Sequence, residues 1–522
     1  MTGHHTGNHT GHHTREITVG TAGMPDRTEL LVVGLGVTGA GVALDAASRG
    51  LDVVAVDAFD LAWGTSRWSS KLVHGGLRYL ANLQFDVAHE SALERGILMQ
   101  TTAPHLTRAL PMVIPLTPSV SRRAAQVSRI AMALGDGLRL TARTSRRTLP
   151  RSRSISVPET LALVPGVRRA GLRGGILAFD GQLEDDARLV IALARTAGAH
   201  SARLHTRSRV VELSGSHAVV RDELTGEVRR IEAKAVVNAA GVWAGGLVDG
   251  ITLKPSRGTH VVLRQESLPG LSVAVMAPLP EERNRFVFLL PQPDGTLYVG
   301  LTDEEVDGTD LPDVPEPSEA EIGFLLDAIS TAFERRLTRD DVVGAYAGLR
   351  PLLDTGGETA DLSRRHAVLT SGTGVVTIVG GKLTTYRRMA EDAVDAAVVQ
   401  RGLAARPCTT GSLPLLGAAD RARLESVDAP ARLVRRYGLE APMVLDNARA
   451  VTGLDDAELL APIAAGLPHT LAELVFGVSH EGARTVGDLL ERRTRIALVP
   501  ADAELARPAA ERALELVEVV TS

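Results

Sequence analysis

Residues 30–57 read LLVVGLGVTGAGVALDAASRGLDVVAVD, and this stretch decides the fold. An apolar run ends at Gly34, a helix-like segment follows Gly36 and Gly39, and a second apolar run ends at Asp57. The order predicts a strand, a helix and a parallel strand within about thirty residues, with an acid about twenty residues after the glycines. It is the pattern of a dinucleotide-binding βαβ unit in an α/β fold.

Each glycine of that unit has a mechanical reason. Gly34 permits a tight turn, Gly36 lets the backbone approach a pyrophosphate, and Gly39 lets helix and strand pack closely. The pyrophosphate is expected at the helix N-terminus, where N–H groups and the helix dipole favour negative charge. Asp57 is expected to accept hydrogen bonds from a ribose. The unit alone does not distinguish NAD from FAD.

Length and composition narrow the class of protein. A chain of 522 residues predicts two or three domains, and 44% apolar with 23% charged residues is typical of a soluble globular protein. The single cysteine, Cys408, allows no internal disulfide, which favours a reducing compartment. The cysteine count also excludes a Cys₄ zinc site or an iron–sulfur cluster within the chain. No transmembrane helix or signal peptide is expected, since no apolar run reaches about 18 residues.

The first 27 residues form a His-rich tail. They contain the repeat TGHHTGNHTGHHT and five of the fifteen histidines. Such a composition cannot bury a core, so residues 1–27 are predicted to be disordered. No functional metal site is predicted there.

A basic block spans residues 121–153, with nine arginines and one acid, Asp136, in a chain of net charge −5. Its first part predicts a helix with Val127, Ile130, Ala131 and Leu134 on one face, ended by Gly135-Asp136-Gly137. Arginines beside one apolar face suit an interfacial helix on an anionic membrane surface. A solvated face or a subunit interface, and hence a homodimer, are the alternatives. No aromatic residue interrupts the block, so no nucleic-acid partner is expected.

The rest of the chain alternates strands and helices. A helix is predicted over 189–200, strands over 209–213, 235–244 and repeatedly within 255–302, and a strand, glycine turn and helix over 375–400. Residues 28–405 are therefore interpreted as interleaved nucleotide and substrate domains, and residues 406–522 as a C-terminal helical domain.

Three motifs carry candidate chemistry. WGTSRWSSKLVHGGLRYL (63–80) offers hydroxyls at Thr65, Ser69 and Ser70 for a cofactor, and Arg78 for a phosphate or carboxylate. AGLRPLL (347–353) and VGGKLTTYR (379–387) add Arg350 and Lys382, the latter beside Gly381 at a predicted helix N-terminus. Three cations on glycine turns at strand ends predict a pocket for an anionic substrate.

The chain resembles the FAD-dependent glycerol-3-phosphate dehydrogenases from about residue 28 to its C-terminus. The resemblance rests on motifs in the same order: GLGVTGAG, SSKLVHGGLRYL, DDARLV, NAAGVWA, RGTHVVL, GLRPL, GGKLTTYR and HEGARTVGDLLERRTRIAL. It implies a Rossmann-like FAD domain, an antiparallel substrate domain and a helical cap. It also implies oxidation of sn-glycerol 3-phosphate to dihydroxyacetone phosphate, electrons passing to a membrane quinone, and peripheral attachment to the inner face of the cell membrane from the cytoplasm.

The resemblance also assigns roles to residues. Substrate contacts are expected from Arg78, Tyr79, Arg350, Arg364 and Lys382. FAD contacts are expected from Gly34, Gly36, Gly39, Asp57, Thr65, Ser69, Ser70, Lys71, Leu72, Val211, Gly241, Gly381 and Thr384. Asp57 departs from the glutamate common in the family but keeps the acceptor, and Arg365-His366 departs from Asp-Tyr.

The catalytic base is left open between His74 and His260, and Arg350 is a candidate to stabilise a developing alkoxide. Two other reactions remain as alternatives. One is oxidation of the same substrate with O₂ as acceptor. The other is oxidation of an amino acid or 2-hydroxy acid, whose carboxylate carries less charge than a phosphate.

Overall fold

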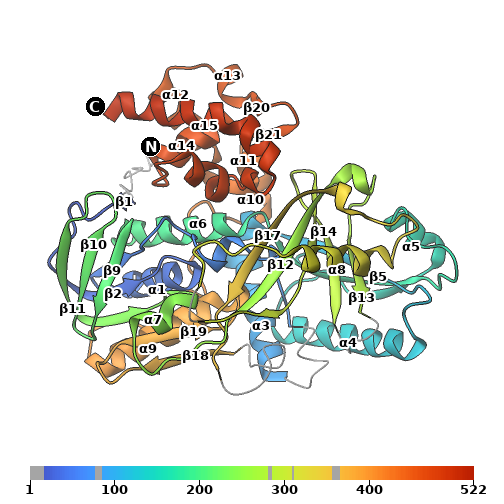
Figure 1. Ribbon diagram of the computed structural model, residues 1–522, viewed down its shortest axis with the longest axis horizontal. Helices are drawn as coiled ribbons and strands as arrows, with labels where there is room; N and C mark the ends of the chain where they lie inside the picture. The colour runs from blue at the N-terminus through green and yellow to red at the C-terminus, as the bar shows by residue number, and fades with distance from the viewer. Residues whose placement is uncertain (1–16, 77–84, 280–284, 309–310, 355–364, 522) are drawn as a thin grey trace, which may run out of the picture.

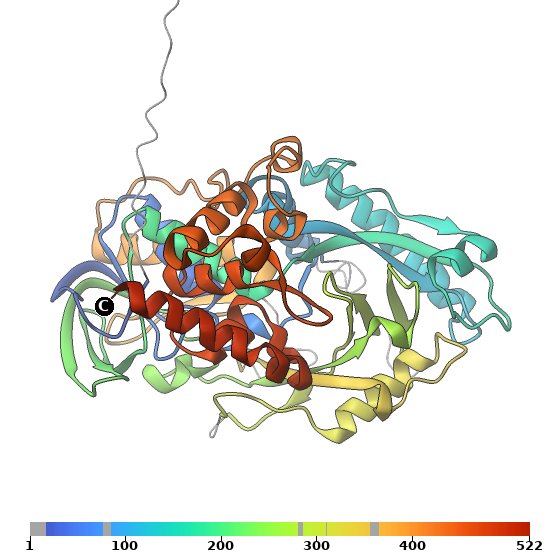
Figure 2. The same cartoon turned by 90° about the horizontal axis from the view of Figure 1, so that it is seen from above.

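The computed structural model describes residues 17–76, 85–279, 285–308, 311–354 and 365–521. Two β-sheets stand side by side, and a helical C-terminal domain lies above them in the view of Figure 1. Seen from above, this domain crosses the junction of the two sheets (Figure 2). The predicted α/β class with a C-terminal helical domain is confirmed.

The first sheet contains the opening βαβ unit. Strand β2 pairs in parallel with β3 and with β11, with Leu30 opposite Val53 and Val33 opposite Val56. Residues Leu30 to Val33 are all buried, because a parallel sheet is covered on both faces and its strands become continuous apolar runs. Its strands are, in spatial order, β1 (Thr18–Val19), β8 (Arg203–Thr206), β3 (Val53–Val56), β2 (Arg27–Val33), β11 (Val228–Asn238), β10 (His217–Asp222) and β9 (Ser208–Leu213), with β19 (Val376–Gly380) beside β11 and β18 (His366–Thr370) beside β19.

The second sheet is mainly antiparallel, as expected for the substrate domain; β13 and β5 are a parallel pair. Its Asp294-Gly295 turn joins β14 to β15, with Gly295 at a φ of +82°. The strands are β16 (Glu304–Glu305), β12 (Ser256–Arg264), β15 (Thr296–Gly300), β14 (Phe286–Pro291), β13 (Ala274–Pro278), β5 (Thr107–Pro115), β7 (Gly175–Leu183) and β4 (Leu72–Val73), with β17 (Val342–Arg350) beside β12 and β6 (Arg153–Ile155) beside β7.

Helices complete the layers. On one face of the first sheet, α1 (Val37–Ser48) packs between α6 (Asp186–Ala199) and α9 (Tyr386–Arg401). The other helices of this part are α3 (Phe85–Ile97), α4 (Arg122–Thr141), α5 (Val157–Leu163), α7 (Ala244–Leu247) and α8 (Glu319–Ser330). The C-terminal domain has its own apolar core. It contains α10 (Arg421–Glu425), α11 (Ala431–Tyr437), α12 (Ala441–Thr452), α13 (Asp456–Leu460), the hairpin β20 (Pro462–Ala464) and β21 (Leu467–Thr470), α14 (Leu471–Ser479), the π-helix η9 (Asp488–Arg493) and α15 (Pro500–Thr521).

Helix α4 differs from the sequence-based expectation. It does not end at Gly135-Asp136-Gly137 but continues to Thr141. A glycine costs a helix only about 1 kcal/mol relative to alanine, so tertiary contacts can override it. Here Ser152 donates its backbone N–H and its hydroxyl to the Asp136 carboxylate, and Arg139 is buried against the carbonyl of Thr144.

The N-terminal tail is also shorter than expected. The prediction of disorder up to residue 27 is wrong for residues 17–27, because β1 pairs in parallel with β8, Ile17 is buried in the core, and β2 begins at Arg27. The Thr21 N–H and hydroxyl both donate to the Asp222 carboxylate. Composition averaged over the His-rich tail concealed this short edge strand. Residues 1–16 lie outside the described part of the chain.

Within the ranges described above, no helix combines the length and the apolar character needed to cross a lipid bilayer.

The β2–α1 turn generates a stability prediction. A Cβ at Gly39 would lie 1.8 Å from the carbonyl oxygen of Gly34, which is backbone and cannot move aside. We expect Gly39→Ala to lower the free energy of unfolding by at least the ~1–3 kcal/mol that overpacking costs. Urea denaturation of the purified protein measures this change.

Gly323→Ala is the matched control. Gly323 lies within α8, and a Cβ there meets no atom within 4 Å. The same substitution should raise the free energy of unfolding by about 0.5–1 kcal/mol, because alanine loses less backbone entropy in a helix. Equal effects of the two substitutions would contradict the steric argument.

Candidate functional site

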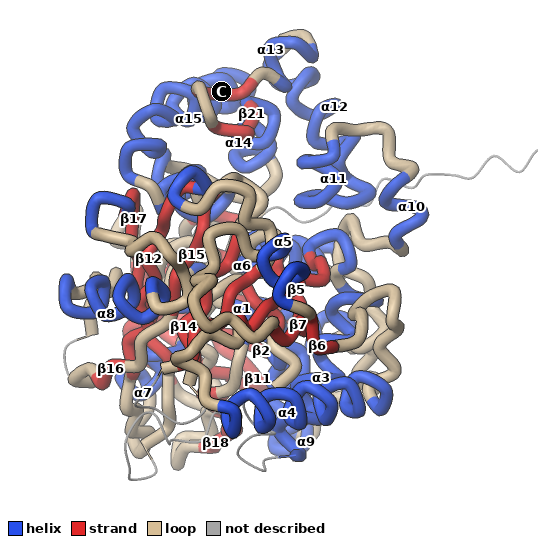
Figure 3. Tube along the Cα trace, turned by 90° about the vertical axis from the view of Figure 1, so that its right-hand side faces the viewer, coloured by secondary structure: helices blue, strands red, loops and turns tan. Residues whose placement is uncertain are grey.

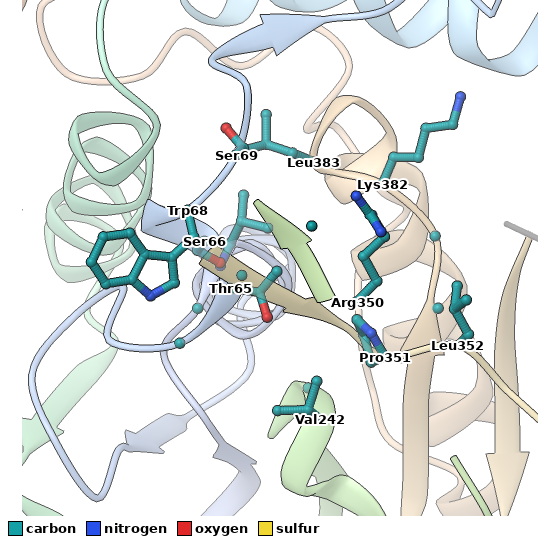
Figure 4. A pocket seen from close by; sticks show the side chains of 18 of the residues that line it. Thr65, Ser66, Trp68, Ser69, Val242, Arg350, Pro351, Leu352, Lys382 and Leu383 are labelled. Atoms are coloured by element: carbon teal, nitrogen blue, oxygen red, sulfur yellow. The ribbon is translucent and has the colours of Figure 1, made fainter. Parts of the chain in front are cut away.

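A cavity of about 1360 Å³ lies between the two sheets. Its volume exceeds the roughly 300–1,000 Å³ of sites for drug-sized ligands, so it has room for a dinucleotide. The β2–α1 turn, residues 57–76, the inner faces of both sheets and residues 380–389 contribute to its wall. Figure 4 shows Arg350 and Lys382 on the side of this pocket opposite Trp68.

One end of the cavity is a cradle for phosphate. Gly36 is the N-cap of α1 and offers no side chain, so the helix N-terminus faces the cavity. The backbone N–H of Val37 donates to the Ser66 hydroxyl at 2.8 Å, and a Cβ at Gly36 would lie 3.0 Å from that hydroxyl. Gly34 adopts a φ of +99°, and a Cβ there would meet the carbonyl of Ala239 at 2.6 Å. Only glycines leave this cradle open.

Asp57 lies at the end of β3 beside this cradle. Its carboxylate accepts hydrogen bonds from the backbone N–H of Leu35 at 2.6 Å and of Phe59 at 2.8 Å. Burial raises the pKa of Asp57 to about 6, although these two backbone donors oppose the shift. Its remaining lone pairs border the cavity, where a ribose hydroxyl can donate to them.

Arg350 is held in place at the end of β17. Its Nη1 donates to the Ser256 hydroxyl and to Asp303 Oδ1, both at 3.0 Å, and its Nη2 donates to the Thr302 carbonyl at 2.9 Å. Gly258 leaves room for the guanidinium, because a Cβ there would lie 2.1 Å from Arg350 Nη2. The side chain is thus oriented before any ligand binds.

Two further cations face the same cavity. Arg285 reaches Asp303 Oδ2 from the start of β14, at 3.4 Å, so one carboxylate lies between two guanidiniums. Lys382 follows two glycines of positive φ, Gly380 and Gly381, and its Nζ donates to the Ser91 hydroxyl at 3.3 Å. The cavity therefore offers several donors to a highly charged anion.

His260 is a buried, neutral histidine. Its Nε2 is 2.8 Å from the Ser70 hydroxyl, and its ring stacks on Tyr346 with centroids 4.8 Å apart. Burial first, and then the charges of Lys71 and Arg350, hold the pKa of His260 well below its usual range.

His74 has a carboxylate partner. Its Nδ1 is 3.3 Å from Asp180 Oδ2, and Asp180 also accepts from Arg95 Nη1 at 2.6 Å and from the N–H of Gly75 at 3.1 Å. Burial tends to raise the pKa of Asp180, but Arg95 and His74 lower it to about 2. An ionised carboxylate on Nδ1 fixes the tautomer whose Nε2 accepts a proton.

Most of the site residues expected from the sequence meet in this one cavity. Its lining includes Gly34, Gly36, Asp57, Thr65, Ser69, Ser70, Leu72, His74, Gly241, His260, Arg350, Gly381, Lys382 and Thr384.

Three expected cofactor contacts do not line it. Gly39 lies against Gly34 within the turn, and Lys71 is buried with its Nζ on Asp186 and the Arg67 carbonyl. Val211 is 48% exposed, and its neighbour Val210 lines the cavity instead, because successive residues of a strand face opposite sides. Arg78, Tyr79 and Arg364 lie outside the described residues.

Sequence reasoning missed several groups at the site. Ser66 stands beside the predicted Thr65 and shares its motif, so the same argument could have found it. Asp180 and Asp303 carry no local signal: Asp180 is 106 residues from His74, and Asp303 is 47 residues from Arg350. Only the pairing of strands brings these carboxylates to their partners.

Comparison with known proteins gives consistent matches. The family model for FAD dependent oxidoreductases matches residues 29–387, and that for the C-terminal domain of alpha-glycerophosphate oxidase matches residues 408–521. Glycerol-3-phosphate dehydrogenase 1 of Mycobacterium bovis is 50% identical over 91% of this chain and 92% of its own length. Glycerol-3-phosphate dehydrogenase of Mycobacterium leprae is 35% identical over 91% and 82%.

Solved structures agree with these matches. The glycerol-3-phosphate dehydrogenase of Bacillus halodurans, complexed with FAD, superposes with a TM-score of 0.70 at 30% identity, covering 95% of this chain and 94% of its own. The L-alpha-glycerophosphate oxidase of Mycoplasma pneumoniae, with FAD bound, shares the fold with a TM-score of 0.56 at 18% identity, covering 75% and 99%.

Proposed function

Because the chain belongs to the family of FAD-dependent glycerol-3-phosphate dehydrogenases, we propose that it oxidises sn-glycerol 3-phosphate to dihydroxyacetone phosphate and passes the electrons to a membrane quinone. The observation that carries this proposal is the placement of Arg350 and Lys382 in the same cavity as the glycine cradle of α1. A cofactor cradle and an anion site thus share one enclosed space.

The residues present fit FAD. The N-terminus of α1, with Gly34, Gly36 and Ser66, would hold the pyrophosphate, and Asp57 would accept from the ribose. When bound, FAD supplies the acceptor for the hydride from substrate C2. The protein has two tasks beside it: it must orient the substrate, and it must take the proton from the C2 hydroxyl.

The cations favour a phosphate over a carboxylate. Arg350 is oriented by fixed partners, and Arg285 and Lys382 face the same space. Several cations around one cavity suit a dianion such as a phosphate monoester, whereas an amino acid or 2-hydroxy acid presents a single negative charge. Arg350 is also placed to stabilise charge on the C2 oxygen as its proton leaves.

His74 is the better candidate for the base. The Asp180 carboxylate on its Nδ1 stabilises the imidazolium that forms when Nε2 accepts the hydroxyl proton. Among the described residues His260 has no such carboxylate partner, and its lowered pKa makes it a weak proton acceptor. It fits better as a hydrogen-bond partner that orients Ser70.

An apolar part of the cavity supports a quinone rather than O₂ as acceptor. It reaches α4 and is lined by Met112, Ile114, Val127, Ala131, Met132, Ala178, Met276, Phe286 and Phe288. Oxygen needs no such space, whereas the ring and isoprenoid tail of a quinone do. The two electrons and two protons taken from the substrate would leave as a quinol.

Helix α4 supports attachment to an anionic membrane. Val127, Ile130 and Leu134 are 41%, 55% and 45% exposed, and most arginines of the block are exposed as well. The helix lies at the end of the molecule opposite the C-terminal domain (Figures 1 and 3). A lipid surface at this end would meet the apolar part of the cavity, from which a quinone could enter. We therefore propose that the protein attaches peripherally to the membrane surface through α4.

The reaction is tested by anaerobic titration of the holoprotein. We expect sn-glycerol 3-phosphate to bleach the flavin absorbance and a quinone analogue to restore it. Arg350→Ala should slow the bleaching by about 10²–10³-fold, the cost of losing one fixed group that stabilises the transition state. Bleaching by a 2-hydroxy acid and not by the phosphate ester would show that the substrate is a 2-hydroxy acid. Recovery of the flavin absorbance with O₂ as fast as with the quinone analogue would contradict the quinone as the preferred acceptor.

The base is tested by Asp180→Asn, with His260→Gln as the comparison. Loss of the carboxylate should lower kcat by about 10²–10⁴-fold. His260→Gln should cost less than about tenfold. The reverse pattern, in proteins of unchanged melting temperature, would make His260 the base.

Membrane attachment is tested by substitution of Ile130 and Leu134 with aspartate. We expect the double variant to lose binding to vesicles of phosphatidylglycerol while keeping its rate with a soluble acceptor, because neither residue lines the cavity. Leu505→Asp is the control, since Leu505 is 57% exposed on α15 at the opposite end. Unchanged binding of the double variant would remove α4 as the membrane surface.

A further inference from the structure

The C-terminal domain does not reach the cavity directly. No described residue after Met389 lines it. The domain instead contacts the back of one wall segment, Phe59–Lys71, which we call the flavin loop. The front of this loop lines the cavity through Trp63, Ser66 and Trp68, among others. Its back carries charged side chains that are buried against the C-terminal segment Glu481–Arg495.

Asp60 is the centre of this contact. It is 1% exposed, and both of its carboxylate oxygens are occupied by arginines of η9. Arg492 Nε donates to Oδ2 at 2.7 Å, and Arg493 donates from Nη1 to Oδ2 at 2.7 Å and from Nη2 to Oδ1 at 3.0 Å. Both arginines are 1% exposed, and Asp60 compensates charge on both of them, while Arg492 also pairs with the buried carboxylate of Asp488.

A second set of contacts connects η9 to Trp63 and Trp68, the two indoles that face the cavity. Glu491 pairs with Arg67 and, at 2.6 Å, with Arg492 Nη1. The Arg67 guanidinium lies 4.2 Å from the ring centroid of Trp68 and 4.8 Å from that of Trp63. Arg492 lies 4.8 Å from the same Trp63 ring. The position of both indoles therefore depends on the charges of η9.

The loop connects this contact to the phosphate cradle. Ser66, between Trp63 and Trp68, accepts the hydrogen bond from Val37 N–H at the N-terminus of α1. Any shift of the loop away from the C-terminal domain would move Ser66 relative to that helix end. The loop also begins two residues after Asp57, whose carboxylate accepts from Phe59 N–H.

We propose that the segment Glu481–Arg495 is a clamp that holds the flavin loop in its FAD-binding conformation, with Asp60, Arg492, Arg493 and Glu491 as positioning residues. None of the four touches the cavity, so they act through the loop. Other C-terminal contacts serve a different purpose: the bidentate pair of Arg195 with Glu440, at 2.6 and 3.0 Å, joins the domain to α6 and does not involve the loop. The role proposed for the clamp rests on FAD being the cofactor and does not depend on the identity of the substrate.

The test compares these two contacts. Asp60→Asn and Glu491→Gln remove one charge from the clamp, and Glu440→Gln removes one charge from the α6 contact as the matched control. Each full-length protein is stripped of FAD and titrated with FAD while flavin fluorescence is followed. The melting temperature of each is measured with excess FAD.

We expect the two clamp variants to raise the dissociation constant of FAD by at least ~10-fold, as loss of outer contacts does at metal sites. Glu440→Gln should lower the melting temperature and leave FAD binding within twofold. Glu491 is 37% exposed, so Glu491→Gln decides the question if Asp60→Asn fails to fold. FAD binding within twofold of wild type in the clamp variants, or an equal loss in Glu440→Gln, would reduce the contact to ordinary domain packing.

Discussion

Two backbone segments approach each other closely at the start of α1, and this contact positions the cavity and its binding groups. Gly39 lies so near the carbonyl of Gly34 that no side chain fits between them. This contact lets β2 turn directly into α1 and points the N-terminus of the helix at the cavity. Because that helix end attracts negative charge, it determines where a pyrophosphate can lie and thus where a flavin can extend.

Ion pairs and hydrogen bonds hold the other polar side chains of the site in position. The polar side chains that face the cavity are held in place: Arg350 is held by Ser256, Thr302 and Asp303, and the candidate base His74 is held by Asp180. Fixed donors cost little reorganisation when a substrate binds, which is the condition for strong electrostatic stabilisation. The same carboxylates keep neighbouring cations from repelling one another before the substrate arrives.

Buried ion pairs also unite the domains. The segment Glu481–Arg495 inserts its charges behind the flavin loop, and Arg188 pairs with Glu481 while Arg207 pairs with Asp488. Such pairs are a weak source of stability, because desolvation offsets much of their attraction. They are, however, directional, since a guanidinium binds a carboxylate in one plane. This property suits a contact whose task is to fix the geometry of a loop rather than to strengthen the fold.

Local sequence patterns were sufficient to predict the βαβ unit, the substrate-domain strands and the helical C-terminal domain, because apolar periodicity and glycine turns are local signals. Most of the site residues that it identified do meet in the cavity, since motifs such as GLGVTGAG and GGKLTTYR carry their chemistry within a few residues. It failed where local signals were weak or misleading, as for the edge strand at Thr18 and the continuation of α4 past Gly137. The partners of His74, Arg350 and Asp60 could not be predicted, because groups distant in the chain come into contact only after the sheets and domains have packed.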